Sequence, residues 1–311
     1  MRARDTAGIR LSVLDTLWPG EMPALVRELD ELGYYRYWNS EHHCTGQSAS
    51  PAVMAAIAAS QTRRLRVGSA GVLLRYQSPL QVAEEFSVLE LFYRGRIDLG
   101  VARNKADPDV ANALLDGRQQ GDEFAAYASR VSLLVNYITQ RIEQSEKPGY
   151  RIDLGMRTMP EVWICGTSEE SAVLAGKLGV CFSFHHYLSG TEGDGSIKAF
   201  GPKVVRRYCE AFTPSYFLLR PQCNVAAYGL CANTKDEATL KWSEFPGALQ
   251  SLPNFVGSPG ECRAQLVQLS GEYGVSEIVI QCVAGRFADR LESYRLLADA
   301  LALTASEAQT C

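Results

Sequence analysis

The sequence predicts an α/β fold, a (β/α)8 TIM-type barrel that spans residues 1–311 as a single domain. Three observations favour this fold. Short runs rich in β-branched and aromatic residues alternate with longer segments of helical periodicity, which is typical of parallel strands joined by crossover helices. Eight strand-like runs are present, the number that closes such a barrel. No repeat, low-complexity tract or flexible linker interrupts the alternation, and barrels of this length commonly form one domain.

The expected strands share an apolar composition with β-branched or aromatic residues. They cover residues 9–15, 35–41, 65–71, 96–102, 161–167, 180–186, 224–230 and 277–283. The expected helices have apolar residues at three- and four-residue spacing. They cover residues 22–32, 52–60, 80–92, 123–137, 168–178, 259–273 and 288–303. Two segments rich in glycine and charged residues, 144–160 and 189–199, are expected to be loops inserted at the C-terminal rim.

An open, doubly wound sheet is the alternative architecture for this alternation. Such a sheet normally places a glycine-rich dinucleotide-binding turn after its first strand. The segment "VLDTLWPGEM" that follows the first expected strand contains no such turn. We therefore favour the barrel, in which functional residues lie at the C-terminal ends of the strands.

Composition excludes several classes of function. Hydrophobic residues make up 46% of the chain and charged residues 21%, as in an ordinary soluble protein. The net charge of −4 and the lack of a long basic tract argue against nucleic acid as a partner. No apolar run reaches the roughly 18 residues that a membrane span needs, and "MRARDTAGIR" lacks the apolar stretch of a signal peptide. We expect a cytoplasmic protein.

The nine cysteines give no sign of a structural framework. Their number is odd and none forms a C-x-x-C pair, which argues against paired disulfides or a zinc knuckle. Several lie within apolar runs such as "VWICG" and "VCFSF", where a free thiol usually behaves as a small buried hydrophobe.

Polar clusters follow several of the expected strands, at the end where a barrel carries its chemistry. All four histidines occur in two adjacent pairs. The clusters are Glu41, His42 and His43 after the second strand, Arg103 after the fourth, Thr167 and Ser168 after the fifth, and His185 and His186 at the end of the sixth. The fold therefore predicts that these side chains share one rim.

The cluster of Glu41, His42 and His43 allows three interpretations. Two histidines and a carboxylate can ligate a metal, but neighbouring residues on a strand point to opposite faces, and no H-x-H or H-x-x-E-H spacing is present. A histidine can also have a structural role, with Glu41 holding a ring nitrogen. Because both histidine pairs fall at the predicted rim, we expect a functional role for at least one of them and no metal site.

The segment "GTSEESAV", residues 166–173, predicts a helix N-terminus. Thr167 is the expected cap, and Glu170 three positions later would complete a capping box. A helix N-terminus with free N–H groups and a hydroxyl is also suited to phosphate, whose charge Arg103 could neutralise from the same rim. No P-loop, nucleophile elbow or G-x-G-x-x-G motif is present, so the phosphorylated ligand is expected to be a compact one.

Four blocks of the sequence resemble the luciferase-like flavin-dependent monooxygenases, the superfamily of bacterial luciferase. "GYYRYWNSEHH" resembles its second-strand signature, and "LRVGSAGVLLRYQSPLQVAEEFSVLELFYRGRIDLGVAR" resembles its most specific stretch. "PEVWICGTSEESAVLAGKLGV" and "FVGSPGECRAQLVQLSGEYGVSEIVI" resemble its fifth and eighth β/α units. The similarity is greatest to the single-chain branch that includes natural-product tailoring enzymes.

This resemblance implies an FMN-dependent oxidoreductase. Reduced FMN, supplied by a separate flavin reductase, would react with dioxygen to a flavin hydroperoxide that oxygenates a small organic substrate. The resemblance also implies a homodimer formed through residues 52–60 and 80–92. Two alternatives share the fold: a deazaflavin-dependent dehydrogenase and a non-catalytic flavin-binding protein.

The resemblance assigns roles residue by residue. His42 matches the catalytic histidine, and Glu41 lies near the flavin. Ala70 and Gly71 match a pair beneath the isoalloxazine ring that relatives join by a non-proline cis peptide bond. His43, His185 and His186 are expected to contact substrate or support the site. The phosphate-binding positions match Arg103, Thr167, Ser168 and Ser171.

Three segments depart from the family pattern. "RNKADPD" stands where relatives often continue "RAPG", so the loop over the flavin phosphate is expected to differ. Ala102 stands where some luciferases carry a reactive cysteine, which removes a thiol from that point. "HHYLSGTEGDGSIKAFG" differs from the family and is expected to form a substrate lid.

Overall fold

Eight parallel strands close into a barrel, which confirms the predicted fold. The computed structural model describes residues 8–16, 19–116, 124–139, 158–188, 197–245 and 253–303. The strand order is β6-β5-β4-β3-β2-β1-β9-β7, and a β6–β7 pairing closes the ring. The barrel strands are β1 (Arg10–Asp15), β2 (Arg36–Asn39), β3 (Arg66–Leu73), β4 (Ile97–Ala102), β5 (Glu161–Gly166), β6 (Cys181–His185), β7 (Cys223–Cys231) and β9 (Glu277–Cys282).

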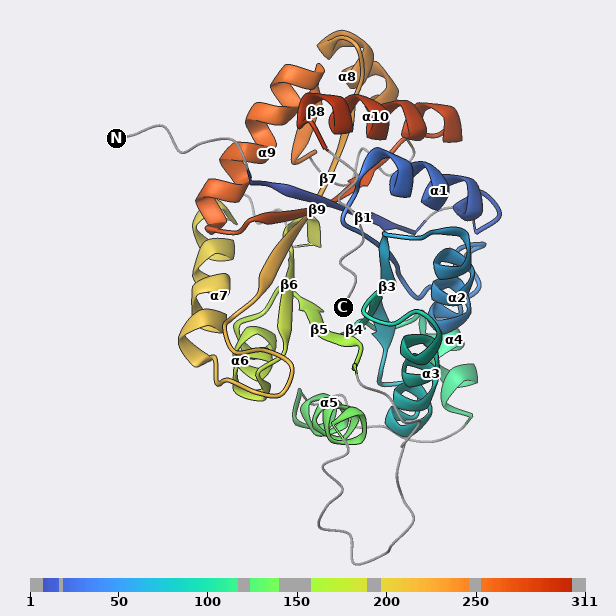
Figure 1. The fold of residues 1–311 in the computed structure, drawn as a ribbon, viewed down its shortest axis with the longest axis vertical. Coiled ribbons are helices and arrows are strands. Elements are labelled where there is room, and N and C mark those ends of the chain that lie inside the picture. The colour runs from blue at the N-terminus through green and yellow to red at the C-terminus, as the bar shows by residue number, and fades with distance from the viewer. Residues whose placement is uncertain are drawn as a thin grey trace, which may run out of the picture.

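Helices surround the barrel on its outside (Figure 1). They are α1 (Met22–Leu32), α2 (Pro51–Gln61), α3 (Pro79–Phe92), α4 (Pro108–Leu115), α5 (Phe124–Ile138), α6 (Glu169–Leu178), α7 (Ile197–Ala211), α8 (Lys235–Ser243), α9 (Pro259–Tyr273) and α10 (Phe287–Ala300). A short 3-10 helix, η1 (His186–Leu188), follows β6, and the short strand β8 (Phe255–Gly257) pairs with the end of β7.

The helix α1 shows how the sequence produces these units. Proline in its first turn fits the fixed backbone angle of a helix start. Leu25, Val26 and Leu29 form its buried face, at the three- and four-residue spacing of a helix. Gly33 ends it in the left-handed region, with φ of 84°, a conformation that glycine adopts without steric cost. The chain then turns back into β2.

A buried ionic cluster fills the N-terminal end of the barrel. The Arg36 guanidinium is completely buried and lies 2.6 Å from Asp98 and 2.7 Å from Glu277. Trp38 donates from Nε1 to Asp98 at 2.9 Å and meets the ring of Trp163 edge-on, with centroids 5.0 Å apart. Because charges and indole rings fill this end, the open space of the barrel lies at the C-terminal ends of its strands.

Sequence analysis did not predict α4, α7, α8 or the short strand β8. The helix α7 carries a glycine and Pro202 inside it, and both residues argue against a helix in sequence. The expected loop 189–199 was wrong at its end, because residues 197–199 belong to α7, whereas 189–196 lie outside the described residues. The expected loop 144–160 also lies outside them, except for residues 158–160.

The described part of the chain bears on the expectations about membrane spans and cysteines. None of its helices is long and apolar enough to cross a membrane. Its eight cysteines are all free thiols, and five of them are buried. The cytoplasmic location stays a prediction.

Candidate active site

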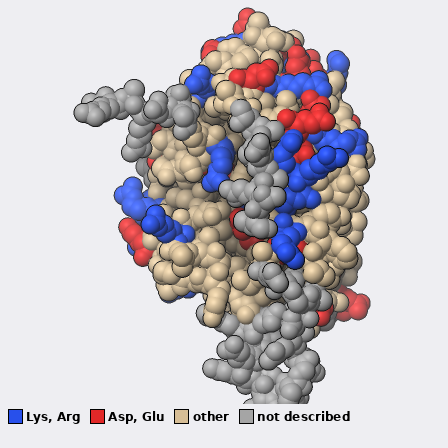
Figure 2. Space-filling model, viewed as in Figure 1, with Lys and Arg blue, Asp and Glu red and all other residues tan. Residues whose placement is uncertain are grey.

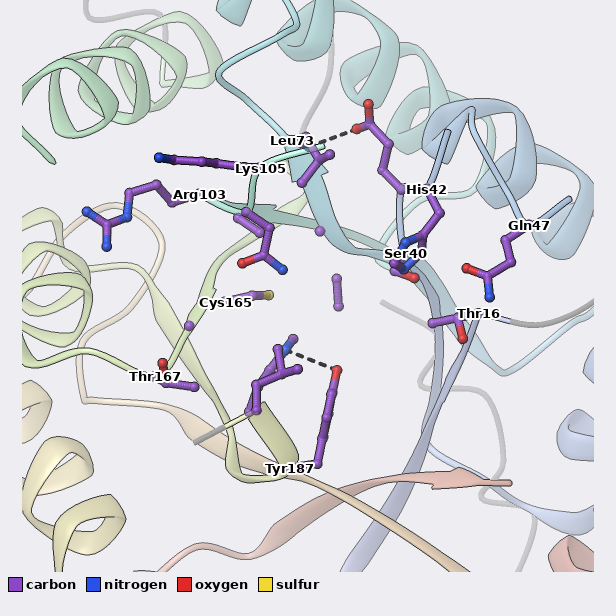
Figure 3. A pocket seen from close by; sticks show the side chains of 18 of the residues that line it. Thr16, Ser40, His42, Gln47, Leu73, Arg103, Lys105, Cys165, Thr167 and Tyr187 are labelled. Atoms are coloured by element: carbon purple, nitrogen blue, oxygen red, sulfur yellow. Dashed lines mark hydrogen bonds between the residues drawn. The ribbon is translucent and has the colours of Figure 1, made fainter. Parts of the chain in front are cut away.

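A cavity of about 690 Å³ opens at the C-terminal ends of the strands (Figure 3). Each of the eight barrel strands places at least one residue, within its last four positions or just after its end, on the cavity lining. Taken one per strand, these residues are Thr16, Ser40, Ala70, Ala102, Cys165, His185, Tyr228 and Gln281. We call this set the cavity floor. The loops after the strands supply the walls.

Ten of the eleven predicted site residues line this cavity. They are Glu41, His42, His43, Ala70, Gly71, Arg103, Thr167, Ser168, Ser171 and His185. The exception is His186, whose Nδ1 lies 2.8 Å from the hydroxyl of Tyr273 on α9. Its ring also packs near Phe184. His186 thus contacts the helix layer and not the cavity, because consecutive residues at a strand end face opposite sides.

The Glu41 carboxylate connects three segments of the rim. The residue is 3% exposed, and its Oε1 lies 2.7 Å from Nε2 of His43. Its Oε2 accepts from the backbone N–H of Leu73 and from Nε2 of Gln77, both at 2.7 Å. Arg130 of α5 holds the same turn by donating to the carbonyls of residues 74 and 77. Both oxygens of Glu41 are therefore engaged in positioning His43 and the turn after β3.

His42 lies at the mouth of the cavity, with an exposed side chain. Its backbone N–H donates to the carbonyl of Ser48 at 2.7 Å. Partial burial of the ring against the cavity lining lowers the pKa of His42 below 6.5, against the opposing effect of Glu41. The ring is therefore neutral at pH 7 and able to accept a proton.

The end of β2 changes the predicted geometry of this cluster. Glu41 and His43 do meet on one side, as strand periodicity indicates. However, β2 ends at Asn39, and the bent chain beyond it lets both histidines line the cavity. Among the described residues, no group of three or more His, Cys, Asp or Glu side chains is placed to hold a metal ion.

The residues of the cavity floor on β3, β4 and β5 have small side chains. Ala70 and Gly71 are joined by a non-proline cis peptide bond, as the family resemblance implies. Ala102 and Cys165 continue this low surface on the next two strands. A Cβ atom on Gly71 would lie 2.9 Å from the backbone of Gly100, so this position accepts only glycine without displacement. The result is a recess that suits a flat ring system.

Hydrogen-bond donors and cations gather at the side of the recess next to α6. The cap of α6 is Ser168, whose Oγ accepts from the N–H of Ser171 at 3.2 Å. The predicted cap at Thr167 and capping box with Glu170 were therefore wrong by one residue. Arg103 and Lys105 reach the cavity from the segment after β4, and the Arg103 guanidinium lies over the ring of Phe124. This corner is suited to an anion.

Aromatic side chains line the part of the cavity formed by β6, η1 and β7. Sequence analysis did not predict them. The rings of Tyr187 and Tyr228 stack with centroids 3.9 Å apart and planes at 16°. His185 stacks on Tyr187 at 5.4 Å, and its Nδ1 lies 3.3 Å from the Tyr187 hydroxyl. Burial lowers the pKa of His185 to about 4, so the ring is neutral at pH 7.

Other cavity residues were missed as well, including Thr16, Ser40, Lys105, Cys165 and Gln281. Gln281 carried a usable signal, because it is a polar residue inside the otherwise apolar run "EIVIQCV". Cys165 carried none, since its apolar surroundings are those of an ordinary buried thiol. Burial raises the pKa of that thiol, which keeps it protonated.

Comparisons with known proteins identify the family of this chain. The family model described as luciferase-like monooxygenase matches residues 12–241. The protein YwcH of Bacillus subtilis is 32% identical over 90% of this chain and 92% of its own length. An N-acetyl-S-alkylcysteine monooxygenase of the same organism is 26% identical over 94% of this chain and 98% of its own.

Solved structures share the fold over nearly the whole chain. Apo-MsnO8 is 29% identical with a TM-score of 0.81, covering 95% of this chain and 99% of its own. The oxygenating constituent of 3,6-diketocamphane monooxygenase from Pseudomonas putida, solved with FMN, is 17% identical with a TM-score of 0.71, covering 95% and 98%. An F420-dependent secondary alcohol dehydrogenase is 13% identical with a TM-score of 0.67, covering 94% and 99%, so these last two show the fold alone.

The family match covers more than half of the chain, and YwcH is more than 30% identical over most of it. The chain therefore belongs to the luciferase-like monooxygenase family and is an oxidoreductase.

Proposed function

We propose that the protein is a flavin-dependent monooxygenase that uses reduced FMN and dioxygen to oxygenate a small organic substrate. The observation that carries the proposal is the meeting, in one cavity, of a flat recess, an anion-binding corner and a neutral histidine. The 3,6-diketocamphane monooxygenase, which shares the fold, was solved with FMN. A separate reductase would deliver the reduced flavin to this cavity.

The residues of the cavity fit FMN in two respects. The small side chains of Ala70, Ala102 and Cys165 leave room for a planar ring on the floor. Arg103, Lys105 and the hydroxyls of Thr167, Ser168 and Ser171 offer the charge and donors that a phosphate group requires. Bound there, reduced FMN would supply the two electrons that activate dioxygen, with one oxygen atom going to the substrate and the other to water.

His42 would move the proton that this chemistry requires. Its neutral ring lines the mouth of the cavity, where it can take a proton from a reacting group and return it. Glu41 would act indirectly, because its two oxygens already hold His43, Leu73 and Gln77. The apolar side chains around the recess would exclude water from the reaction.

We also propose that the protein is a homodimer, joined through α2 and α3. Their outer faces carry exposed apolar side chains, among them Val53, Ile57, Val88, Leu91 and Phe92. The surface over these helices, at the right of Figure 2, is mostly uncharged. An exposed apolar area shared by neighbouring helices is typical of a subunit interface.

Anaerobic titrations with reduced FMN, reduced riboflavin and reduced deazaflavin coenzyme test the choice of cofactor. The proposal predicts that FMN binds most tightly. Arg103→Ala should weaken FMN by roughly 2 to 3 kcal/mol, as expected for a charge-assisted pair, and leave riboflavin almost unchanged. Tighter binding of the deazaflavin, with no dioxygen uptake on FMN, would instead indicate a dehydrogenase.

A further inference from the structure

The floor residues on β6 and β9 each leave one buried polar atom without a partner in the part of the chain that the structure describes. His185 is 4% exposed, and the atom is its Nε2. Gln281 is also 4% exposed, and the atom is its Oε1. Both side chains line the cavity. A buried polar atom that stays unpaired is destabilising, so each is expected to gain a partner from a bound molecule.

Each of these side chains is anchored by its other polar atom. The hydroxyl of Tyr187 lies 3.3 Å from Nδ1 of His185, and Nε2 of Gln281 donates to Oγ1 of Thr16 at 2.9 Å. Gln281 also pairs in register with Tyr228 on β7. Rigid strands and these hydrogen bonds therefore fix the orientation of the unpaired atoms, which is what selective recognition requires.

The chemistry of the anchored groups defines what they can bind. An amide oxygen only accepts hydrogen bonds, so the partner of Gln281 must offer an O–H or N–H group. The His185 ring is neutral at pH 7, so its Nε2 can make a hydrogen bond to an uncharged ligand without attracting an anion. Beside both lies the stacked pair of Tyr187 and Tyr228, which offers aromatic surface to a planar molecule.

The cations of the cavity lie elsewhere. Figure 3 shows Arg103 and Lys105 on one side of the cavity, Tyr187 below, and Thr16 on the opposite side. An anionic cofactor group would therefore bind away from His185 and Gln281. The aromatic side of the floor is left for a second, uncharged molecule.

We propose that His185 and Gln281 form the substrate-recognition site and select an uncharged aromatic substrate that carries a hydroxyl or N–H group. The inference rests on the proposed function, because it gives the substrate the part of the cavity that the cofactor leaves. A substrate without the donor would bury Gln281 Oε1 unpaired, which should weaken binding by about tenfold or more.

The test compares 2-naphthol with 2-methylnaphthalene, which replaces the hydroxyl by a methyl group of similar size. Fluorescence titration of the full chain, with and without reduced FMN under anaerobic conditions, should show at least about tenfold tighter binding of 2-naphthol. Gln281→Leu and His185→Phe should each bring the ratio of the two affinities close to one. Gln47→Leu, a glutamine at the same cavity, should leave the ratio unchanged.

Three results would overturn the inference: equal binding of the two compounds by the wild-type chain, no measurable binding of 2-naphthol, or variants that weaken FMN and leave the ratio intact. The last result would assign the two residues to the cofactor. A wild-type chain that discriminates between the naphthalenes but does not bind reduced FMN supports the recognition site and contradicts the proposed cofactor. Failure of the recognition site and failure of the proposed cofactor can therefore be told apart.

Discussion

At the scale of single residues, the proposed chemistry depends on His42. Its neutral ring lies at the cavity mouth, whereas His43 is held by the Glu41 carboxylate at 2.7 Å. We expect His42→Ala to leave reduced FMN bound but to lower oxygenated product by about 10²-fold, the usual contribution of a general acid or base. More of the consumed dioxygen should then leave as hydrogen peroxide, which a peroxidase-coupled assay measures.

His43→Ala is the matched control for this prediction. It removes a neighbouring imidazole that contacts Glu41, so we expect a smaller loss through altered packing. The pH dependence gives a second check. Because partial burial lowers the pKa of His42, product formation should fall only below pH 6.5, and this acid limb should vanish in His42→Ala. Near wild-type product yield in His42→Ala would remove this residue from the mechanism.

The burial of His185 predicts a pH dependence of stability. Its pKa falls from 6.5 to about 4 on folding, so between these values the unfolded chain binds a proton that the folded chain does not. This contribution to stability is complete above pH 6.5 and is lost as pH falls towards 4. Between pH 7.5 and 4.5 the wild-type chain should lose roughly 2 to 3 kcal/mol more unfolding free energy than His185→Phe.

Urea unfolding of both proteins at the two pH values measures this difference. The comparison cancels the other groups that titrate in this range, since they are common to the two chains. Equal losses in the two proteins would show that His185 is accessible to protons in the folded state.

At the scale of elements, β3 and β4 approach each other so closely that their contact requires glycine. A Cβ atom on Gly100 would lie 2.2 Å from the carbonyl oxygen of Ser69, which is a backbone atom and cannot rotate away. We expect Gly100→Ala to lower the unfolding free energy by about 1 to 3 kcal/mol, as overpacking does. It should also disturb the recess, because Ala70 and Gly71 follow Ser69 directly.

Gly271→Ala on α9 is the control for this change. No heavy atom lies within 4 Å of a Cβ there, so alanine should stabilise the helix by about 0.5 to 1 kcal/mol. Thermal melts of both variants measure the two effects. Equal melting temperatures for the two variants would contradict the close approach of β3 and β4.

Element by element, sequence reasoning succeeded where local signals agree. The helices α1 and α9 were predicted with their observed ends, because apolar periodicity, a proline in the first turn and a glycine at the end coincide there. The helix α8 was missed because its polar sequence has almost no apolar face, and β8 because three residues give no periodicity. The cap of α6 was predicted one residue early because Thr167 and Ser168 are adjacent and both are residue types that cap helices, although serine is preferred.

In the candidate site, too, the sequence predicts what local signals determine and not what depends on contacts between distant segments. Residues that directly follow a strand, such as His42 and Arg103, could be assigned to the rim from topology alone. The stacking of Tyr187 on Tyr228 could not, because it joins η1 to β7 and the two residues are 41 positions apart in the sequence. Nor could the contact of Glu41 with Gln77, which depends on how the turn after β3 folds over the rim.

At the scale of the whole molecule, the apolar faces of α2 and α3 predict assembly. Phe92 is 75% exposed and Val53 is 55% exposed, which is costly for large apolar side chains in a monomer. We expect light scattering to give about twice the chain mass of 34.2 kDa. Charge introduced by Phe92→Glu should shift the mass towards the monomer, whereas Leu240→Glu, at an exposed position on α8, should not.

In the proposed function, this cavity holds reduced FMN and directs its reaction with dioxygen. Rapid mixing of the protein and reduced FMN with oxygenated buffer tests it most directly, if dioxygen uptake and the absorbance of oxidised flavin are followed together. We predict that dioxygen is consumed well before the oxidised-flavin band returns, and that the delay shortens in His42→Ala. Return of the band together with dioxygen uptake, at the rate of free reduced FMN, would rule out the proposed function.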